Sequence, residues 1–376
     1  MTSYLDYADI GVVRPAARAA MRHTVDAVLP RGSAEYGQFF TARTAAREAG
    51  AALLDCHPDE VALVANTSAG LQLVADGLAW RVGDEVVVFE RDFPANVQPW
   101  RRLRERGIRL RWVPMRDGRY ELDDVASAIG AATRLVALSH VHFVTGFRID
   151  LDAVCTLAKP YGALVCVDAV QSLGVVPMSL SRTPVDFAVA GAHKWLCAPP
   201  GTGLFFCRRE RLEMLGRAPL GWFGYDGSDR IFGHGEGQLV YDLPPRPAAR
   251  RFEGGMLNFV GIAGMAAALD EIVAVGAETI WERVRSLTAT LREGLSDLGY
   301  AGGDPSMPAA GIVSFAPHRG RFTVDAARLQ ADLALRDCHC SNPDGHIRLS
   351  PHYWTTADEV GLFLDALRTI VSEHSS

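Results

Sequence analysis

Lysine is rare in this chain, and its scarcity draws attention to the two positions where it remains. Of the 38 basic residues, only Lys159 and Lys194 are lysines. An amine can lose its proton and attack a carbonyl carbon, whereas a guanidinium stays protonated. A retained lysine is therefore a candidate nucleophile, and chance retention on the surface is the alternative.

Sequence context separates the two lysines. Lys159 ends a helical pattern just before Pro160, where a cation is favourable and solvated, so we assign it a structural role. Lys194 follows the apolar run 186–190 and precedes a turn rich in proline and glycine. Ligands of parallel α/β sheets bind at the carboxyl ends of strands, and a half-desolvated amine there has a lowered pKa. Lys194 is the predicted nucleophile.

Two further features would suit one cofactor. Asp168 ends the apolar run ALVCVD, where it either pairs with a cation such as a protonated pyridine nitrogen or caps the next segment. Residues 66–70 (NTSAG) join a strand to a helix, and they form either a phosphate cradle or an ordinary helix cap. A Schiff-base lysine, a carboxylate for a ring nitrogen and a phosphate cradle are the three anchors of pyridoxal phosphate.

The elements that must position these residues alternate along the chain. Apolar runs of strand length are separated by mostly helical stretches, a pattern typical of a mainly parallel α/β sheet. We expect helices at 15–28, 41–55, 259–275 and 279–298. The predicted strands are 61–64, 86–89, 109–113, 135–138, 163–167, 186–190 and 203–206.

Length and composition restrict the protein class. With 376 residues and 48% hydrophobic residues, the chain has enough apolar side chains for a sizeable core and about two domains. A net charge of −6 argues against binding to nucleic acid or a membrane surface. Seven scattered cysteines form no disulfide framework and suit the cytoplasm, and we expect neither a signal peptide nor a membrane span.

The order and spacing of these motifs resemble a known family over almost the whole chain. The chain resembles the class V aminotransferases among fold-type I pyridoxal phosphate enzymes, a group that includes cysteine desulfurases, isopenicillin N epimerase, kynureninase and C–S lyases. The resemblance implies an α/β large domain with a mainly parallel seven-stranded sheet and a smaller α+β domain. We expect residues 15–258 to form the large, cofactor-binding domain and residues 1–14 and 259–376 the small one.

The resemblance assigns roles around the strand ends. Lys194 resembles the lysine that carries the cofactor, and His193 the residue that often contacts the phosphate. Asp168 resembles the partner of the pyridine nitrogen. Gln171, in the same DAVQ motif, is expected to reach the ring hydroxyl.

Four more residues follow from the resemblance. Ser68 and Ala69 resemble the phosphate-binding turn. Phe93 is similar to the aromatic residue that stacks on the cofactor ring in the kynureninase and epimerase branches, where desulfurases carry a histidine nearby. Arg348, in HIRLSPHYWTT, resembles the arginine that grips the substrate α-carboxylate through two hydrogen bonds.

Departures from the family pattern lie in three segments. His142 and Phe143 replace a usual Ser-Asn pair, so His142 either supplies the missing bond to the ring hydroxyl or fills a strand position. Residues 253–256 (EGGM) lack the threonine that reaches the partner subunit's phosphate, and Asn258 is a candidate replacement. Cys338 and Cys340 lie too close to Arg348 for the desulfurase nucleophile, so we predict core residues and no metal site.

These residues predict a pyridoxal phosphate enzyme acting on an amino acid. Because no persulfide cysteine is evident, the first choice is a C–S lyase of secondary metabolism that eliminates a thiol from an S-substituted cysteine. The alternatives are an aminotransferase, an epimerase, a decarboxylating oxidative deaminase, or a catalytically silent regulatory protein. The family also implies a homodimer with active sites at the subunit boundary, so the aromatic residues of the segment 221–255 line either a substrate pocket or that interface.

Overall fold

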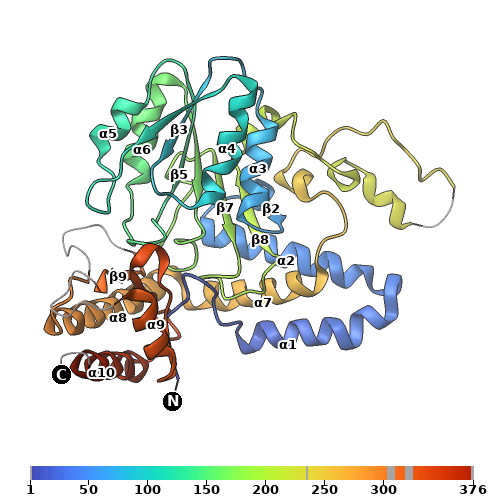
Figure 1. The fold of residues 1–376 in the computed structure, drawn as a ribbon. Helices are drawn as coiled ribbons and strands as arrows, with labels where there is room; N and C mark the ends of the chain where they lie inside the picture. Colours follow the sequence, from blue (N-terminus) through green and yellow to red (C-terminus); the bar gives the residue numbers. More distant parts are fainter. Residues whose placement is uncertain (1, 234–235, 303–309, 318–324, 374–376) are drawn as a thin grey trace.

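A seven-stranded sheet forms the centre of the large part of the molecule (Figure 1). This computed structural model describes residues 2–233, 236–302, 310–317 and 325–373. The strand order is β2-β8-β7-β6-β5-β3-β4, in which β8 runs antiparallel to both neighbours and the other pairs are parallel. The predicted α/β fold with a mainly parallel sheet is confirmed. The strands are β2 (Val61–Val64), β3 (Glu85–Phe89), β4 (Arg109–Val113), β5 (Thr133–Ser139), β6 (Leu164–Asp168), β7 (Phe187–Gly191) and β8 (Gly203–Cys207).

Helices separate most of these strands, as the sequence predicts. Helix α1 runs directly into a π-helical turn that ends at Val28, and α2 begins five residues before the predicted start at 41. Side-chain caps start several helices; for example, Asp150 accepts a hydrogen bond from the Ala153 N–H at the start of α6. The helices around the sheet are α1 (Pro15–His23), α2 (Tyr36–Leu54), α3 (Thr67–Gly77), α4 (Gln98–Arg102), α5 (Leu122–Ala128), α6 (Leu151–Ala158) and α7 (Phe259–Val275).

Both faces of the sheet are covered, which explains why its strands are continuous apolar runs. In β3, Val87 and Phe89 belong to a core shared with α1, α2, α5, α6 and α7. Val86 and Val88 point to the opposite face and share a second core with α3 and α4. Because neighbouring residues point to opposite faces, one strand contributes to both cores.

A third core lies in the C-terminal part of the chain. The strands β9 (Val313–Phe315) and β11 (Ile347–Leu349) pair antiparallel, whereas β1 (Ser3–Tyr4) pairs parallel with β10 (Cys338–His339). The first strand thus ties the N-terminus to the C-terminal part, as Figure 1 also shows. The helices of this part are α8 (Ala277–Asp297), α9 (Ala326–Ala334) and α10 (Ala357–Glu373).

The predicted division after residue 258 stays a prediction, but the packing favours a later boundary. Helix α7 lies against α1 and α2 (Figure 1), and its Ile262 and Met265 belong to the first core. Within α8, Val284 belongs to the first core and Leu287 to the third. The change from one core to the other therefore occurs inside α8.

Membrane-spanning candidates are limited. Among the described residues, no single helix has the length and apolar character needed to cross a membrane. Helices α7 and α8 meet those criteria only as a pair that is bent by 81° between them.

Candidate active site

The topology brings the predicted site residues to one edge of the sheet. Asp168 is the last residue of β6, and Lys194 follows the end of the neighbouring parallel strand β7. β2 runs in the same direction as β7 because β8 is antiparallel to both. The turn at Ser68 and Ala69, which follows β2, therefore opens at the same edge as Asp168 and Lys194.

Asp168 is a buried carboxylate with few protein partners. Its side chain is 2% exposed, and Oδ1 accepts a hydrogen bond of 2.9 Å from the Val170 N–H. Burial raises its pKa to about 7; the Val170 N–H and the Lys194 ammonium oppose that rise, and the nearby Asp92 adds to it. Among the described residues, no hydrogen bond to Oδ2 is found, so this oxygen is available to an added donor.

Lys194 lies in a setting that favours its neutral amine. Desolvation and the positive charge of Arg348 lower its pKa to about 8, although Asp168 acts in the opposite direction. The amine nitrogen lies 5.5 Å from the centre of the Phe93 ring. Phe93 is itself 41% exposed and meets Phe143 edge to face, with ring centres 5.2 Å apart. The described structure therefore brings Lys194, Asp168 and Phe93 together.

The predicted phosphate turn is built by tight packing of α3 on β7. The Thr67 hydroxyl accepts a hydrogen bond of 2.9 Å from the Gly191 N–H. A Cβ atom on Gly70 would overlap the Val189 side chain, so only glycine allows this approach. Ser68 is exposed and Ala69 half-buried, but Asn66 already accepts a hydrogen bond from the Ala69 N–H. The turn is thus an N-cap as well as an open helix N-terminus.

Gln171 has clear hydrogen-bond partners, and His193 lies next to Lys194 in the chain. The Gln171 side-chain oxygen accepts a hydrogen bond from the Trp195 indole, and its nitrogen donates one to the Ala8 carbonyl. These bonds hold Gln171 beside the lysine segment, and its contact with a ring hydroxyl stays a prediction. The half-buried His193 has a lowered pKa because of desolvation and the charge of Lys194.

Arg348 is buried in β11, and its side chain makes three hydrogen bonds. Its side chain is 4% exposed. Nε donates to the Ser341 hydroxyl at 3.0 Å, Nη1 to the Phe143 carbonyl at 3.0 Å, and Nη2 to Asp6 Oδ1 at 3.5 Å. The Asp6 contact joins residues 342 positions apart in the sequence, and no local pattern in the sequence indicates it.

His142 has a structural environment. Its Nδ1 accepts a hydrogen bond from the Thr145 N–H, and its Nε2 lies 2.9 Å from the Arg91 carbonyl, which requires the proton on Nε2. Burial lowers its pKa, so the ring is neutral. Both ring nitrogens are therefore occupied, which favours the structural of the two alternatives. Arg91, whose carbonyl is one of the partners, has a left-handed backbone conformation (φ 59°).

Asp92 is a second buried carboxylate, and it is not among the site residues predicted from the sequence. It accepts hydrogen bonds from the Phe93 N–H at 2.7 Å, the Asn96 amide at 2.9 Å and the Ser139 hydroxyl at 2.7 Å. These bonds fix the turn that carries the Phe93 ring. The spacing of an aspartate and an asparagine four residues apart was the signal available in the sequence.

The comparisons with known proteins decide the family. The model of the aminotransferase class-V family matches residues 16–363. The chain belongs to this family. A probable cysteine desulfurase from Methanothermobacter thermautotrophicus is 30% identical over 344 residues, which cover 86% of this chain and 82% of the relative.

A second relative and a solved structure are also similar to this chain. Isopenicillin N epimerase from Streptomyces clavuligerus is 28% identical, over 87% of this chain and 84% of the relative. The solved structure of the cystine C–S lyase C-DES with its product cysteine persulfide has a TM-score of 0.87 at 23% identity, and the match covers 97% of each chain. At that identity the similarity of the two structures establishes the fold.

The cofactor of this class V enzyme is pyridoxal phosphate, which a related C-DES structure carries. The described residues fit that group. Asp168 offers a buried carboxylate oxygen without a protein donor, and Lys194 offers an amine of lowered pKa. Phe93 offers an exposed ring beside that amine, and the N-terminus of α3 opens at the same edge of the sheet.

The cysteines of this class V chain lie away from its exposed surface. All seven are described and free; six are buried, and Cys56 is half-buried. Cys338 and Cys340 lie in the third core, as predicted for core residues, and burial raises the pKa of the Cys340 thiol to about 12. Cys197, the nearest to Lys194 in the sequence, is also buried, and its pKa is about 12. No thiol lies exposed at the site.

The altered EGGM segment of this class V chain is held in place by ion pairs and hydrogen bonds. The buried Glu253 pairs with Arg43 and Arg47 of α2 and accepts a hydrogen bond from the Leu63 N–H. The Asn258 side chain caps α7 by accepting a hydrogen bond from the Gly261 N–H. A phosphate contact of Asn258 stays a prediction.

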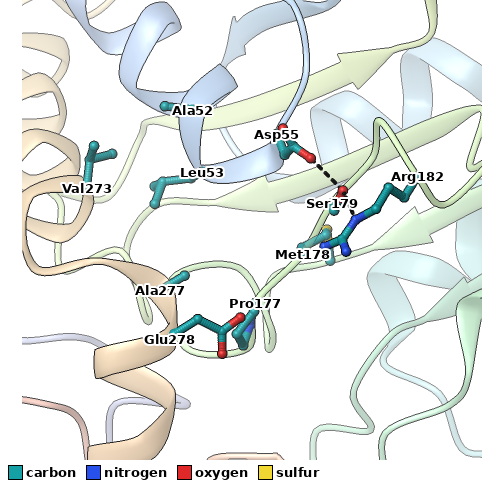
Figure 2. Close-up of a pocket in the computed structure, with 10 residues that line it drawn as sticks. All are labelled: Ala52, Leu53, Asp55, Pro177, Met178, Ser179, Arg182, Val273, Ala277 and Glu278. Atoms are coloured by element: carbon teal, nitrogen blue, oxygen red, sulfur yellow. Dashed lines mark hydrogen bonds between the residues drawn. The ribbon is translucent and has the colours of Figure 1, made fainter.

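A separate open cavity of about 290 Å³ lies outside this site (Figure 2). In it, Ser179 donates a hydrogen bond to Asp55 and accepts one from Arg182. None of the predicted site residues lines it. The lining residues are Ala52, Leu53, Asp55, Pro177, Met178, Ser179, Arg182, Val273, Ala277 and Glu278.

Proposed function

We propose that this chain is a C–S lyase that cleaves an S-substituted cysteine into a thiol, pyruvate and ammonia. The observation that carries the proposal is that none of the seven cysteines is exposed, six being buried and Cys56 half-buried, whereas Lys194 has a lowered pKa. A desulfurase needs a thiol that takes sulfur from the substrate, whereas elimination releases the sulfur directly. The relatives named cysteine desulfurase and the neighbour named cystine C–S lyase support cleavage next to sulfur.

Each predicted residue has a role in this reaction. We propose that Lys194 binds the cofactor and then removes the proton from the substrate Cα, for which its low pKa is suited. Bound pyridoxal phosphate supplies an electron sink for the charge left at Cα. Asp168 would hold the ring nitrogen protonated, and Phe93 would offer its aromatic face to the ring. Ser68, Ala69 and His193 would bind the phosphate, Gln171 the ring hydroxyl, and Arg348 the substrate carboxylate.

The leaving group would meet apolar surroundings. Phe93 and Phe143 form an edge-to-face pair next to the lysine amine. An apolar sulfur substituent packs against such rings, whereas a charged one loses hydration there. Loss of the Cα proton is followed by breakage of the Cβ–S bond, and water then releases pyruvate and ammonia. We therefore propose an S-alkyl or S-aryl cysteine as substrate.

The test uses purified protein charged with pyridoxal phosphate and given S-methyl-, S-benzyl- or S-phenylcysteine. Free thiol and pyruvate in equal amounts are expected from the wild type, and neither from Lys194→Ala. Lys159→Ala is the matched control and should retain activity, because Lys159 is exposed at the end of α6. Absence of thiol and pyruvate with every conjugate would overturn the proposal.

Epimerisation is the second candidate, because an isopenicillin N epimerase matches 87% of the chain. Solvent deuterium at Cα of recovered substrate, without thiol release, would favour it. Dependence on a keto acid would indicate transamination, and release of carbon dioxide would indicate decarboxylation.

The homodimer, the cytoplasmic location and the role in secondary metabolism remain proposals. Apolar side chains on the segment 221–255 support an interface, since Trp222 is 44%, Leu239 71% and Tyr241 84% exposed. Residues 234 and 235 of that segment lie outside the described residues. Light scattering of the purified protein tests the dimer.

A further inference from the structure

Arg348 has a counter-charge from the opposite end of the chain. Its guanidinium is almost fully buried, and Asp6 is the only carboxylate in the described part of the chain that forms an ion pair with it. A buried guanidinium without a compensating anion is costly. Asp6 therefore neutralises Arg348 when no other anion is present.

The position of Asp6 is fixed by its neighbours. The Ser341 hydroxyl donates a hydrogen bond of 2.8 Å to Asp6 Oδ1 and accepts one from Arg348 Nε. The Asp6 backbone bridges to Ser350, next to β11. Asp6 Oδ1 thus accepts hydrogen bonds from both Arg348 and Ser341, and these two side chains also hydrogen-bond to each other.

The contact between the two charges is loose. The distance from Arg348 Nη2 to Asp6 Oδ1 is 3.5 Å, whereas charge-assisted hydrogen bonds measure about 2.7–2.9 Å. Burial raises the pKa of Asp6 to about 6, and Ser341 and Arg348 oppose this rise, so Asp6 is ionised at pH 8. An anion with better geometry would compete for the same guanidinium.

We propose that Asp6 sets the carboxylate affinity of the active site, because it neutralises Arg348 in the free enzyme and shares the guanidinium with the substrate carboxylate. This inference rests on the proposed role of Arg348. Removing the charge of Asp6 has two opposite effects. It leaves Arg348 less stable in the fold, and it leaves the guanidinium more attractive to an incoming carboxylate. If Asp6 had a purely structural role, removing its charge would weaken both the fold and the binding of the carboxylate.

The test is calorimetric titration of the pyridoxal phosphate-loaded enzyme with 3-(methylthio)propanoate at pH 8. This probe has the carboxylate and the thioether but no amine, so it does not react with the cofactor. We expect Asp6→Asn to bind it about tenfold more tightly than wild type at low salt, with a lower melting temperature. Asp6→Ser removes the same charge with a smaller side chain and should tighten binding likewise if the asparagine variant does not fold.

Two further variants make the outcome decisive. Asp123→Asn removes the same charge from an exposed position on α5, and should change binding less than twofold. Arg348→Ala should lose at least about ten-fold in affinity. Unchanged or weaker binding by the Asp6 variants, with Arg348→Ala impaired, would overturn the role of Asp6 alone. Unchanged binding by Arg348→Ala would overturn the role of Arg348 as well.

Discussion

Gly11 lies directly against the backbone carbonyl of Lys194. A Cβ atom on Gly11 would approach that oxygen far inside 3.0 Å, the limit below which real Cβ contacts essentially never occur. The Gly11 N–H also donates a hydrogen bond of 2.7 Å to the His193 carbonyl. The N-terminal segment therefore supports the backbone that carries the lysine.

Gly11→Ala should displace this backbone. We expect a lower melting temperature and at least about tenfold weaker retention of pyridoxal phosphate, because an added methyl group has no space next to a fixed carbonyl. Dialysis followed by absorbance of the bound cofactor measures retention. Gly361→Ala is the control, since a Cβ there meets no atom within 4 Å. Equal retention by both variants would contradict this prediction.

Asp168→Asn should stabilise the cofactor-free protein at pH 8. The folded-state pKa of Asp168, about 7, exceeds its value of 3.8 in the unfolded chain, so its contribution to stability is complete at low pH and is lost as pH rises through 7. Asparagine removes the buried charge and keeps the Val170 hydrogen bond. We expect a gain on the order of 3 kcal/mol at pH 8 that shrinks by more than half at pH 5.

Urea unfolding of the cofactor-free proteins at both pH values tests this gain. The same variant should lose the proposed lyase activity once loaded with cofactor, because a neutral amide does not hold the ring nitrogen protonated. Asp123→Asn is the control, because Asp123 is exposed. Asp186 is not suitable, since it forms an ion pair with Arg211. A stability difference independent of pH would contradict the pKa argument.

Local patterns predicted the sheet and its edge. All seven strands lie within about two residues of the expected runs, because strands buried on both faces are continuous apolar segments. Lys194 and Asp168 were found because each follows or ends such a run. The C-terminal capping position of Lys159, after α6, was predicted by Pro160.

Contacts between distant segments could not be predicted this way. The pair of Asp6 and Arg348 joins the two ends of the chain, and no local period links them. Helix α7 was expected in the small domain because it follows the long loop, yet it packs on α1 and α2. The orientation of the His142 ring depends on Thr145 and on the Arg91 carbonyl, which belongs to a different loop.

Cofactor uptake should follow the pKa of Lys194. Only the neutral amine attacks an aldehyde, and with a pKa of about 8 its fraction rises from roughly one-tenth at pH 7 to one-half at pH 8. Uptake of pyridoxal phosphate by the cofactor-free protein should therefore level off above about pH 8.5. Stopped-flow absorbance measures the rate, and reaction with a lysine model peptide corrects for ionisation of the cofactor. A rate that still rises tenfold per pH unit at pH 9 would indicate an ordinary lysine.

Glu253→Gln should destabilise the fold because Glu253 compensates two arginines. The Glu253 side chain is fully buried, and those of Arg43 and Arg47 are 3% and 11% exposed. Glutamine keeps the shape but leaves both guanidinium groups without an anion, which costs about 3–5 kcal/mol for a buried pair. The bond to the Leu63 N–H links this cluster to β2, so the loss extends to the sheet edge.

Urea unfolding of the cofactor-loaded protein measures this loss. Glu48→Gln is the matched control, since Glu48 follows Arg47 on the same helix α2 but is exposed. We expect that control to change stability by less than about 0.5 kcal/mol, as surface substitutions usually do. A loss of that size in Glu253→Gln itself would mean that the two arginines find other partners. The altered EGGM segment would then have no structural role through Glu253.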